Sequence, residues 1–170
     1  MKNKKEHLTY ILFGIYLFAL VWIILFKFDL TFENMGTMRN INLVPYSGPT
    51  RLNGEIVRSE IYLNMLIFMP FGIYMEMLFN KWPYLQKLGV FILASLFFEG
   101  LQYILAVGIS DVTDVIHNVI GGVAGVILYK IICKLIKDQE RAQNVMNFVA
   151  LLGTISMVSI LIFYDVPYFI

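Results

Sequence analysis

The sequence predicts an all-α, polytopic integral membrane protein with about five transmembrane helices and no separate soluble domain. Hydrophobic residues make up 59% of its 170 residues and charged residues only 15%, whereas a soluble domain is roughly one-half apolar and one-quarter charged. Several apolar stretches also reach the roughly 20 residues that a membrane helix needs. We therefore expect a single membrane domain, residues 1–170, that lies in a lipid bilayer.

Five apolar segments are expected to cross the bilayer. The first follows a short cationic head and is longer than the roughly 7–15-residue core of a signal peptide, and no small-residue cleavage site follows it, so we expect an uncleaved helix. Proline, glycine and charged residues separate the later segments. The expected helices cover residues 8–28, 61–79, 84–107, 114–135 and 145–164.

The positions of lysine and arginine predict the orientation. If the amino terminus is cytoplasmic and there are five spans, nine of the 13 lysines and arginines lie on the cytoplasmic side. Those nine are Lys2, Lys4, Lys5, Lys81, Lys87, Lys130, Lys134, Lys137 and Arg141. Because positive charge concentrates in cytoplasmic loops, this orientation is favoured, and it leaves the carboxyl terminus outside.

Polar and small residues share one face of the fourth expected helix. Asp111, Asp114, Asn118, Gly121 and Gly125 recur at steps of three and four residues, which places them on one side of a helix that begins near position 111. The two glycines form a small-xxx-small pattern that allows another helix to approach closely. We expect this face to carry both a polar site and a packing contact.

Other polar residues are expected in the same half of the bilayer. Asn64 lies near the outer end of the second helix, and Ser95, Glu99 and Gln102 share one face of the third. With the orientation above, all the intramembrane polar residues lie in the outer half, and the cytoplasmic half is apolar apart from boundary charges. We expect one polar cavity open to the outside or to the outer leaflet, with Arg39 and Arg58 above it.

Simpler roles compete with a binding site. Asn64, Ser95 and Gln102 are also typical of polar residues that only join helices, and Asp111 and Asp114 would stabilise a helix amino terminus. Glu99 favours function more strongly, because an ionisable group within the membrane is costly. His117 could join these carboxylates at a metal, but the spacing matches no metal motif, so we expect no metal and no cofactor. The charge pattern indicates no nucleic-acid partner.

Four motifs in order resemble the VanZ-like membrane protein family. They are Arg39–Tyr46, which includes Asn42 and Pro45; Asn64-xxx-Phe68-x-Pro70-x-Gly72; Ser95-xxx-Glu99-xx-Gln102; and Asp111-xx-Asp114-xxx-Asn118-xx-Gly121-xxx-Gly125. Together they extend over residues 39–128. The resemblance implies a multi-pass protein of the bacterial cytoplasmic membrane that contributes to antibiotic resistance at the cell envelope, by lowering sensitivity to lipoglycopeptides such as teicoplanin.

The resemblance supplies no molecular mechanism, and two readings stay open. In the first, the outer cavity binds a lipid-anchored glycopeptide antibiotic or a lipid-linked cell-wall precursor without catalysis. Its ligand-binding residues would be Arg39, Asn42, Asn64, Glu99, Gln102, Asp111, Asp114 and Asn118, and its structural residues Pro45, Pro70, Gly72, Gly121 and Gly125. In the second, Glu99, Asp111 and Asp114 serve as acid and base, or as metal ligands, of an enzyme that acts on a lipid-linked substrate.

Overall fold

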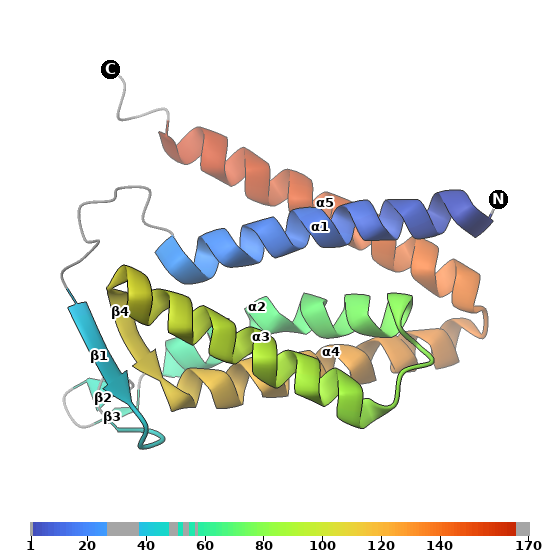
Figure 1. Cartoon of the computed structure of the whole chain (residues 1–170). Helices are drawn as coiled ribbons and strands as arrows, with labels where there is room; N and C mark the ends of the chain where they lie inside the picture. The colour runs from blue at the N-terminus through green and yellow to red at the C-terminus, as the bar shows by residue number, and fades with distance from the viewer. Residues whose placement is uncertain (1, 27–37, 48–50, 53–54, 57, 166–170) are drawn as a thin grey trace.

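Five long helices make up most of the protein. The computed structural model describes residues 2–26, 38–47, 51–52, 55–56 and 58–165. The helices are α1 (Lys2–Phe26), α2 (Arg58–Leu78), α3 (Tyr84–Leu105), α4 (Val112–Ile136) and α5 (Gln139–Asp165). They run side by side in alternating directions, with the start of α1 and the α2–α3 turn at one end of the bundle and the strands at the other (Figure 1).

Four of these helices, in the described part of the chain, are long and apolar enough to cross a membrane. The apolar spans are Glu6–Ile24, Ser59–Leu78, Tyr84–Leu105 and Val112–Ile136. The chain is therefore a helical membrane protein, as the composition predicts. The fifth helix, α5, is present as expected, but its crossing of the bilayer stays a prediction.

The helix boundaries differ from those expected. The cationic head is helical from Lys2, and α5 begins at Gln139 within the expected charged linker. Charged and amide side chains lower the apolar signal at these ends without preventing helix formation, since lysine, glutamate and glutamine are good helix formers. The end of the first expected helix, residues 27–28, lies outside the described residues.

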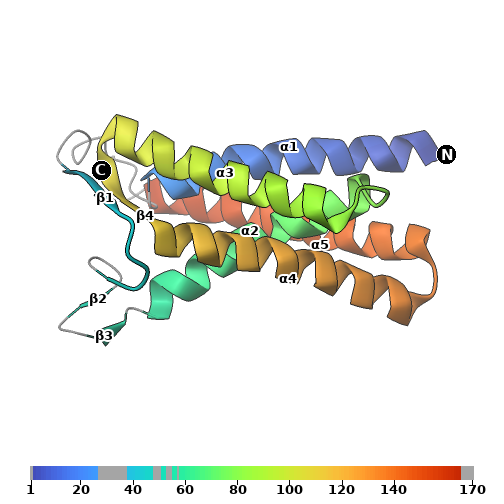
Figure 2. The ribbon, with the colours of Figure 1, turned by 60° about the horizontal axis from the view of Figure 1, so that its bottom comes forward.

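The all-α prediction missed a pair of strands at one end of the bundle. β1 (Met38–Asn42) runs parallel to β4 (Val107–Asp111), with Asn42 opposite Asp111. β4 therefore replaces the expected end of the third helix, and β1 lies where a loop was expected. A second, short antiparallel pair joins β2 (Arg51–Leu52) and β3 (Glu55–Ile56). β1 and β4 lie against the end of α3 (Figure 2).

The closest helix contact joins α2 and α4. A Cβ atom added at Gly121 would lie 2.2 Å from the Met65 carbonyl oxygen, and one added at Gly125 would lie 2.0 Å from that of Met69. Gly72 faces α4 in the same way, because its added Cβ would lie 1.8 Å from the Gly122 oxygen. Only hydrogen atoms fit between these backbones. The contact fixes the polar start of α4 beside the start of α2.

Candidate functional site

The junction between α3 and α4 sets the frame of the site. The α3 helix ends at Leu105 and is capped by Ala106, which has a left-handed backbone (φ 50°) and whose N–H donates to the carbonyls of Gln102 and Tyr103. β4 then runs along the end of the bundle and leads into α4. Because this connection is a strand rather than helix, it brings the first residues of α4 back over the last turns of α3.

Asp111 holds this junction together. Its Oδ1 caps α4 by accepting from the Thr113 N–H at 2.8 Å, and its Oδ2 accepts from Nδ2 of Asn42 at 3.1 Å. Its own N–H donates to Oε2 of Glu99 at 2.9 Å. An aspartate at this position satisfies backbone donors that a helix start leaves unpaired. Asp111 is thus a buried connector between β1, α3 and α4.

The β1 end is fixed by a network around Asn42. Besides its bond to Asp111, the Asn42 Nδ2 donates to the Ser47 carbonyl at 2.7 Å, and the Asn42 Oδ1 accepts from the Ser47 hydroxyl at 2.9 Å. Pro45 and Tyr46 occupy the centre of the turn closed by Ser47 N–H and the Val44 carbonyl, and Tyr46 has φ 57°. Proline followed by a positive φ is the pattern of a type II turn.

The other predicted polar residues join the helices in pairs. Asn64 Nδ2 donates to Oδ1 of Asp114 at 2.7 Å, which links α2 to α4. Asn118 Nδ2 donates to the Ser95 hydroxyl at 2.9 Å, which links α4 to α3. Gln102 Nε2 donates to the Ile24 carbonyl at 2.9 Å, which links α3 to α1. Four helices therefore meet around one group of amides and carboxylates.

These pairs surround a cavity of about 200 Å³. It is lined by Asn64, Glu99, Gln102, Asp114 and Asn118, together with Glu60 and the apolar residues Ile23, Ile24, Leu63 and Ile67. Glu99, Gln102 and Asn118 are each at most 5% exposed. Gln102 Oε1 is buried and has no hydrogen-bond partner. A polar cavity with an acceptor oxygen that lacks a donor is suited to a ligand that donates hydrogen bonds.

Two of the eight predicted ligand-binding residues do not line this cavity. Asn42 and Asp111 are instead engaged in the strand and cap contacts described above. The Arg39 backbone pairs with Gly108 in the parallel strands, whereas its side chain, like that of Arg58, lies outside the described residues. Glu60, one turn before Asn64, lines the cavity and was not predicted.

His117 belongs to a neighbouring contact with the β1 turn. Its Nδ1 lies 2.8 Å from the Thr113 carbonyl, so that nitrogen carries the proton, and Nε2 lies 3.5 Å from the Tyr46 hydroxyl. The Thr113 hydroxyl accepts from the Tyr46 N–H at 2.9 Å. In the described part of the chain, no three His, Cys, Asp or Glu side chains are grouped so that they could hold a metal ion.

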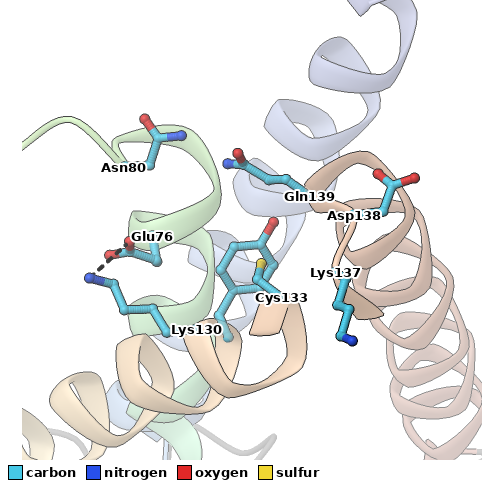
Figure 3. A pocket seen from close by; sticks show the side chains of 8 residues that line it. Glu76, Asn80, Lys130, Cys133, Lys137, Asp138 and Gln139 are labelled. Atoms are coloured by element: carbon cyan, nitrogen blue, oxygen red, sulfur yellow. Dashed lines mark ion pairs between the residues drawn. The ribbon is translucent and has the colours of Figure 1, made fainter. Parts of the chain in front are cut away.

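A second charged cluster lies at the opposite end of the bundle. Glu76 and Lys87 form an ion pair in which both side chains are buried, and Lys130 Nζ lies 3.6 Å from the Glu76 Oε1. Figure 3 shows Lys130 directed at the Glu76 carboxylate beside a pocket of about 470 Å³. The sequence carried part of this signal, because Glu76 lies two residues before the end of α2 and Lys87 three residues after the start of α3, which places both at the same end of the bundle.

Buried polar residues also occur at the amino-terminal end of the bundle, where the sequence predicts only apolar residues and boundary charges. Thr9 on α1 and Asn147 on α5 are both buried, and the Asn147 Nδ2 donates to the Thr9 hydroxyl at 3.0 Å. Gln143 Nε2 donates to the same hydroxyl at 2.8 Å. These residues join α1 to α5 near the amino-terminal end, far from the cavity, and their role is interhelical packing of the kind expected in membranes.

A helical membrane protein with a polar cavity at the strand end of its bundle is the class that these observations define. The VanZ/LLP1 family model matches residues 13–134. The chain is also 33% identical over 143 residues to Protein VanZ of Enterococcus faecium, which covers 83% of this chain and 84% of that protein. The chain therefore belongs to the VanZ/LLP1 family. No solved structure matches it.

Proposed function

We propose that this chain is a multi-pass protein of the bacterial cytoplasmic membrane that lowers sensitivity to teicoplanin by binding a lipid-anchored ligand at its polar cavity. Membership of the family that includes Protein VanZ supports the resistance role. The observation that supports the binding role is the cavity between α1, α2, α3 and α4, where polar side chains from α2, α3 and α4 converge. The amino terminus is cytoplasmic, which turns the cavity outward.

The hydrogen bonds around the cavity favour binding over catalysis. Asp111 is engaged as the cap of α4 and as the partner of Asn42, so it is not available as the acid or base that the enzymatic reading requires. Glu99 and Asp114 each fix a neighbouring element through a hydrogen bond. Preorganised groups of this kind orient hydroxyl, amide or amine groups of a bound molecule.

Susceptibility to teicoplanin and vancomycin in a sensitive bacterial host tests this proposal. The host expresses the chain, Glu99→Gln or Asp114→Asn at matched membrane levels. Loss of one charge-assisted hydrogen bond, about 1.5–3 kcal/mol, weakens ligand binding roughly 10- to 150-fold, so each variant is expected to lose protection against teicoplanin. Glu6→Gln is the matched control, because the same chemical change falls on an exposed residue at the opposite end.

Full protection with both cavity variants would overturn the binding role of the cavity. An absence of protection by the unaltered chain would overturn the resistance role for this protein.

A further inference from the structure

Another cavity, which we call the apolar cavity, lies between α1, α2 and α5. It has a volume of about 320 Å³, and none of the described residues that line it is charged. Ala19 on α1 and Ala150 and Gly153 on α5 are part of this lining. A Cβ atom added at Gly153 would meet nothing within 4 Å. Small residues on two of the three helices therefore help to leave the space open.

Water finds few partners in the apolar cavity. Two of the three hydroxyl groups that the described residues bring to its lining are already engaged, because Tyr16 donates to the Ile67 carbonyl at 2.7 Å and Thr154 to the Ala150 carbonyl at 2.8 Å. Buried water needs two to four polar partners, whereas an apolar cavity of about 150 Å³ stays dry and accepts a small hydrocarbon. A space about twice that size is suited to an alkyl chain.

The apolar cavity opens at the surface of the bundle. Ile15 and Val149, which line it from α1 and α5, are 40% and 52% exposed, whereas Tyr74 and Met77 on its α2 side are buried. Ile15 lies at the centre of the apolar span Glu6–Ile24. The medium outside this opening is therefore the hydrocarbon of the bilayer, so the occupant of the cavity is drawn from lipid.

The apolar cavity runs along one half of the bundle. On α2 its lining extends from Pro70, near the middle of the span Ser59–Leu78, to Met77, close to the α2–α3 turn, which is about 10 Å at the helical rise. Met77 also lines a pocket of about 460 Å³ whose polar residues include Asn80 and Lys81. Polar surroundings therefore begin at the Met77 end, and hydrocarbon surrounds the Pro70 end, as along one lipid of a single leaflet.

From these observations we propose that the apolar cavity binds one hydrocarbon chain of a membrane lipid from the leaflet at the α2–α3 end of the bundle. The chain begins near Met77 and ends near Pro70. A helix of another protein does not fit, because a helix about 10 Å wide occupies about 800 Å³ over this length. The inference is independent of the resistance role, since it concerns a different cavity in the other half of the bilayer.

Photocrosslinking in proteoliposomes tests the occupant. The full-length protein is reconstituted in phosphatidylcholine that includes a small share of molecules with a diazirine at the end of one acyl chain, and mass spectrometry locates the crosslinked residues. We expect crosslinks at Ile73 and Ala150, which are half-buried in the lining of the cavity, and also at lipid-exposed residues such as Phe97, which is 60% exposed on α3. Crosslinks confined to exposed residues would overturn the proposal.

A pair of leucine variants tests the site. A Cβ atom added at Gly153 or at Gly14 meets nothing within 4 Å, but of the two only Gly153 lines the apolar cavity. Gly153→Leu is expected to reduce crosslinking at Ile73 roughly tenfold, or by about 1.4 kcal/mol, because the new side chain takes space that the lipid chain needs. Crosslinking at Phe97 is expected to stay unchanged, as is all crosslinking in Gly14→Leu. Equal effects of the two variants at Ile73 would overturn the site.

The position of the diazirine tests the direction of the chain. A diazirine close to the ester carbonyl is expected to crosslink Met77, and one at the end of the chain is expected to crosslink Pro70, because these residues line opposite ends of the cavity on α2. The reverse order would place the head group at the strand end of the bundle and overturn the assignment of the leaflet.

Discussion

Buried charge is stabilised differently at the two ends of the bundle. At the cavity, Glu99 and Asp114 accept hydrogen bonds from a backbone N–H and an amide. At the opposite end, the Glu76 carboxylate meets Lys87 and Lys130. The first arrangement pairs the carboxylates with N–H donors at the lining of a cavity, whereas the second pairs a carboxylate with lysines. We therefore assign the ligand role to the first cluster and a stabilising role to the second.

Glu76→Gln is expected to destabilise the protein by about 3–5 kcal/mol, because it leaves the buried Lys87 charge without its partner. The side chains of Lys87 and Glu76 are 3% and 7% exposed. The midpoint of thermal unfolding in detergent measures the effect. The double variant Glu76→Gln, Lys87→Met is expected to recover much of the loss.

Arg141→Gln is the control for this experiment. It breaks the exposed ion pair in which Arg141 Nε lies 3.3 Å from Asp138 Oδ2. Exposed ion pairs contribute at most about 1 kcal/mol to stability. Similar losses in Glu76→Gln and Arg141→Gln would show that burial of the pair does not matter.

Residues on regular helices were predicted well, and those fixed by distant pairing were not. Asn64, Glu99, Gln102, Asp114 and Asn118 line one cavity, because helical spacing and a common depth already place them together. The connecting role of Asp111 depends on Asn42, 69 residues away. No local pattern carries that information, since it arises from the pairing of β1 with β4.

At the scale of elements, apolar length predicted the helices and missed the strands. β4 is only five residues long, and its partner β1 is separated from it by α2 and α3. Parallel pairing across such a distance leaves no turn signal in the sequence, unlike a hairpin. The glycine steps on α4, in contrast, predict a close helix approach, and α2 supplies it at Met65 and Met69.

Gly125→Ala is expected to destabilise the α2–α4 contact by about 1–3 kcal/mol, the usual cost of overpacking. The added Cβ would lie 2.0 Å from the Met69 carbonyl oxygen, so one helix backbone must shift. Gly100→Ala is the matched control on α3, because its added Cβ meets nothing within 4 Å. We expect this control to be neutral or slightly stabilising in thermal unfolding, since alanine favours helix. Equal destabilisation of both variants would contradict the role of the contact.

At the scale of the whole molecule, the orientation decides which face of the membrane the cavity serves. The strands lie at one end of the bundle and the α2–α3 turn at the other (Figure 1). Residues near the starts of α2 and α4 line the cavity at the strand end, and Glu76 and Lys87 lie near the α2–α3 turn. Nine of the 13 lysines and arginines belong to segments at the Glu76 end, so the positive-inside rule predicts that this end faces the cytoplasm. A ligand in the outer leaflet then reaches the cavity without crossing the bilayer.

Cysteine labelling in intact cells tests this orientation. Cys133 is the single cysteine, so Cys133→Ser gives a background for one new cysteine at a time. Leu43, at the strand end, is 76% exposed, and Lys81 lies in the exposed turn between α2 and α3, so Leu43→Cys and Lys81→Cys place the new cysteine at opposite ends of the bundle. We expect a membrane-impermeant maleimide to label the first in intact cells and the second only after permeabilisation. The reverse pattern would place the cavity in the cytoplasm and contradict a ligand from the outer leaflet.

A tag that follows Ile170 extends the test to α5. With a cytoplasmic amino terminus, five spans place the tag outside, where protease removes it from intact cells. Protection of the tag until permeabilisation would show that α5 does not cross the bilayer. In that case α1 and α5 would still be joined through Thr9 and Asn147, but α5 would not form one wall of a cavity that opens to lipid. The count of spans therefore bears directly on the cavity of about 320 Å³ between α1, α2 and α5, because α5 supplies Ala150 and Gly153 to its lining.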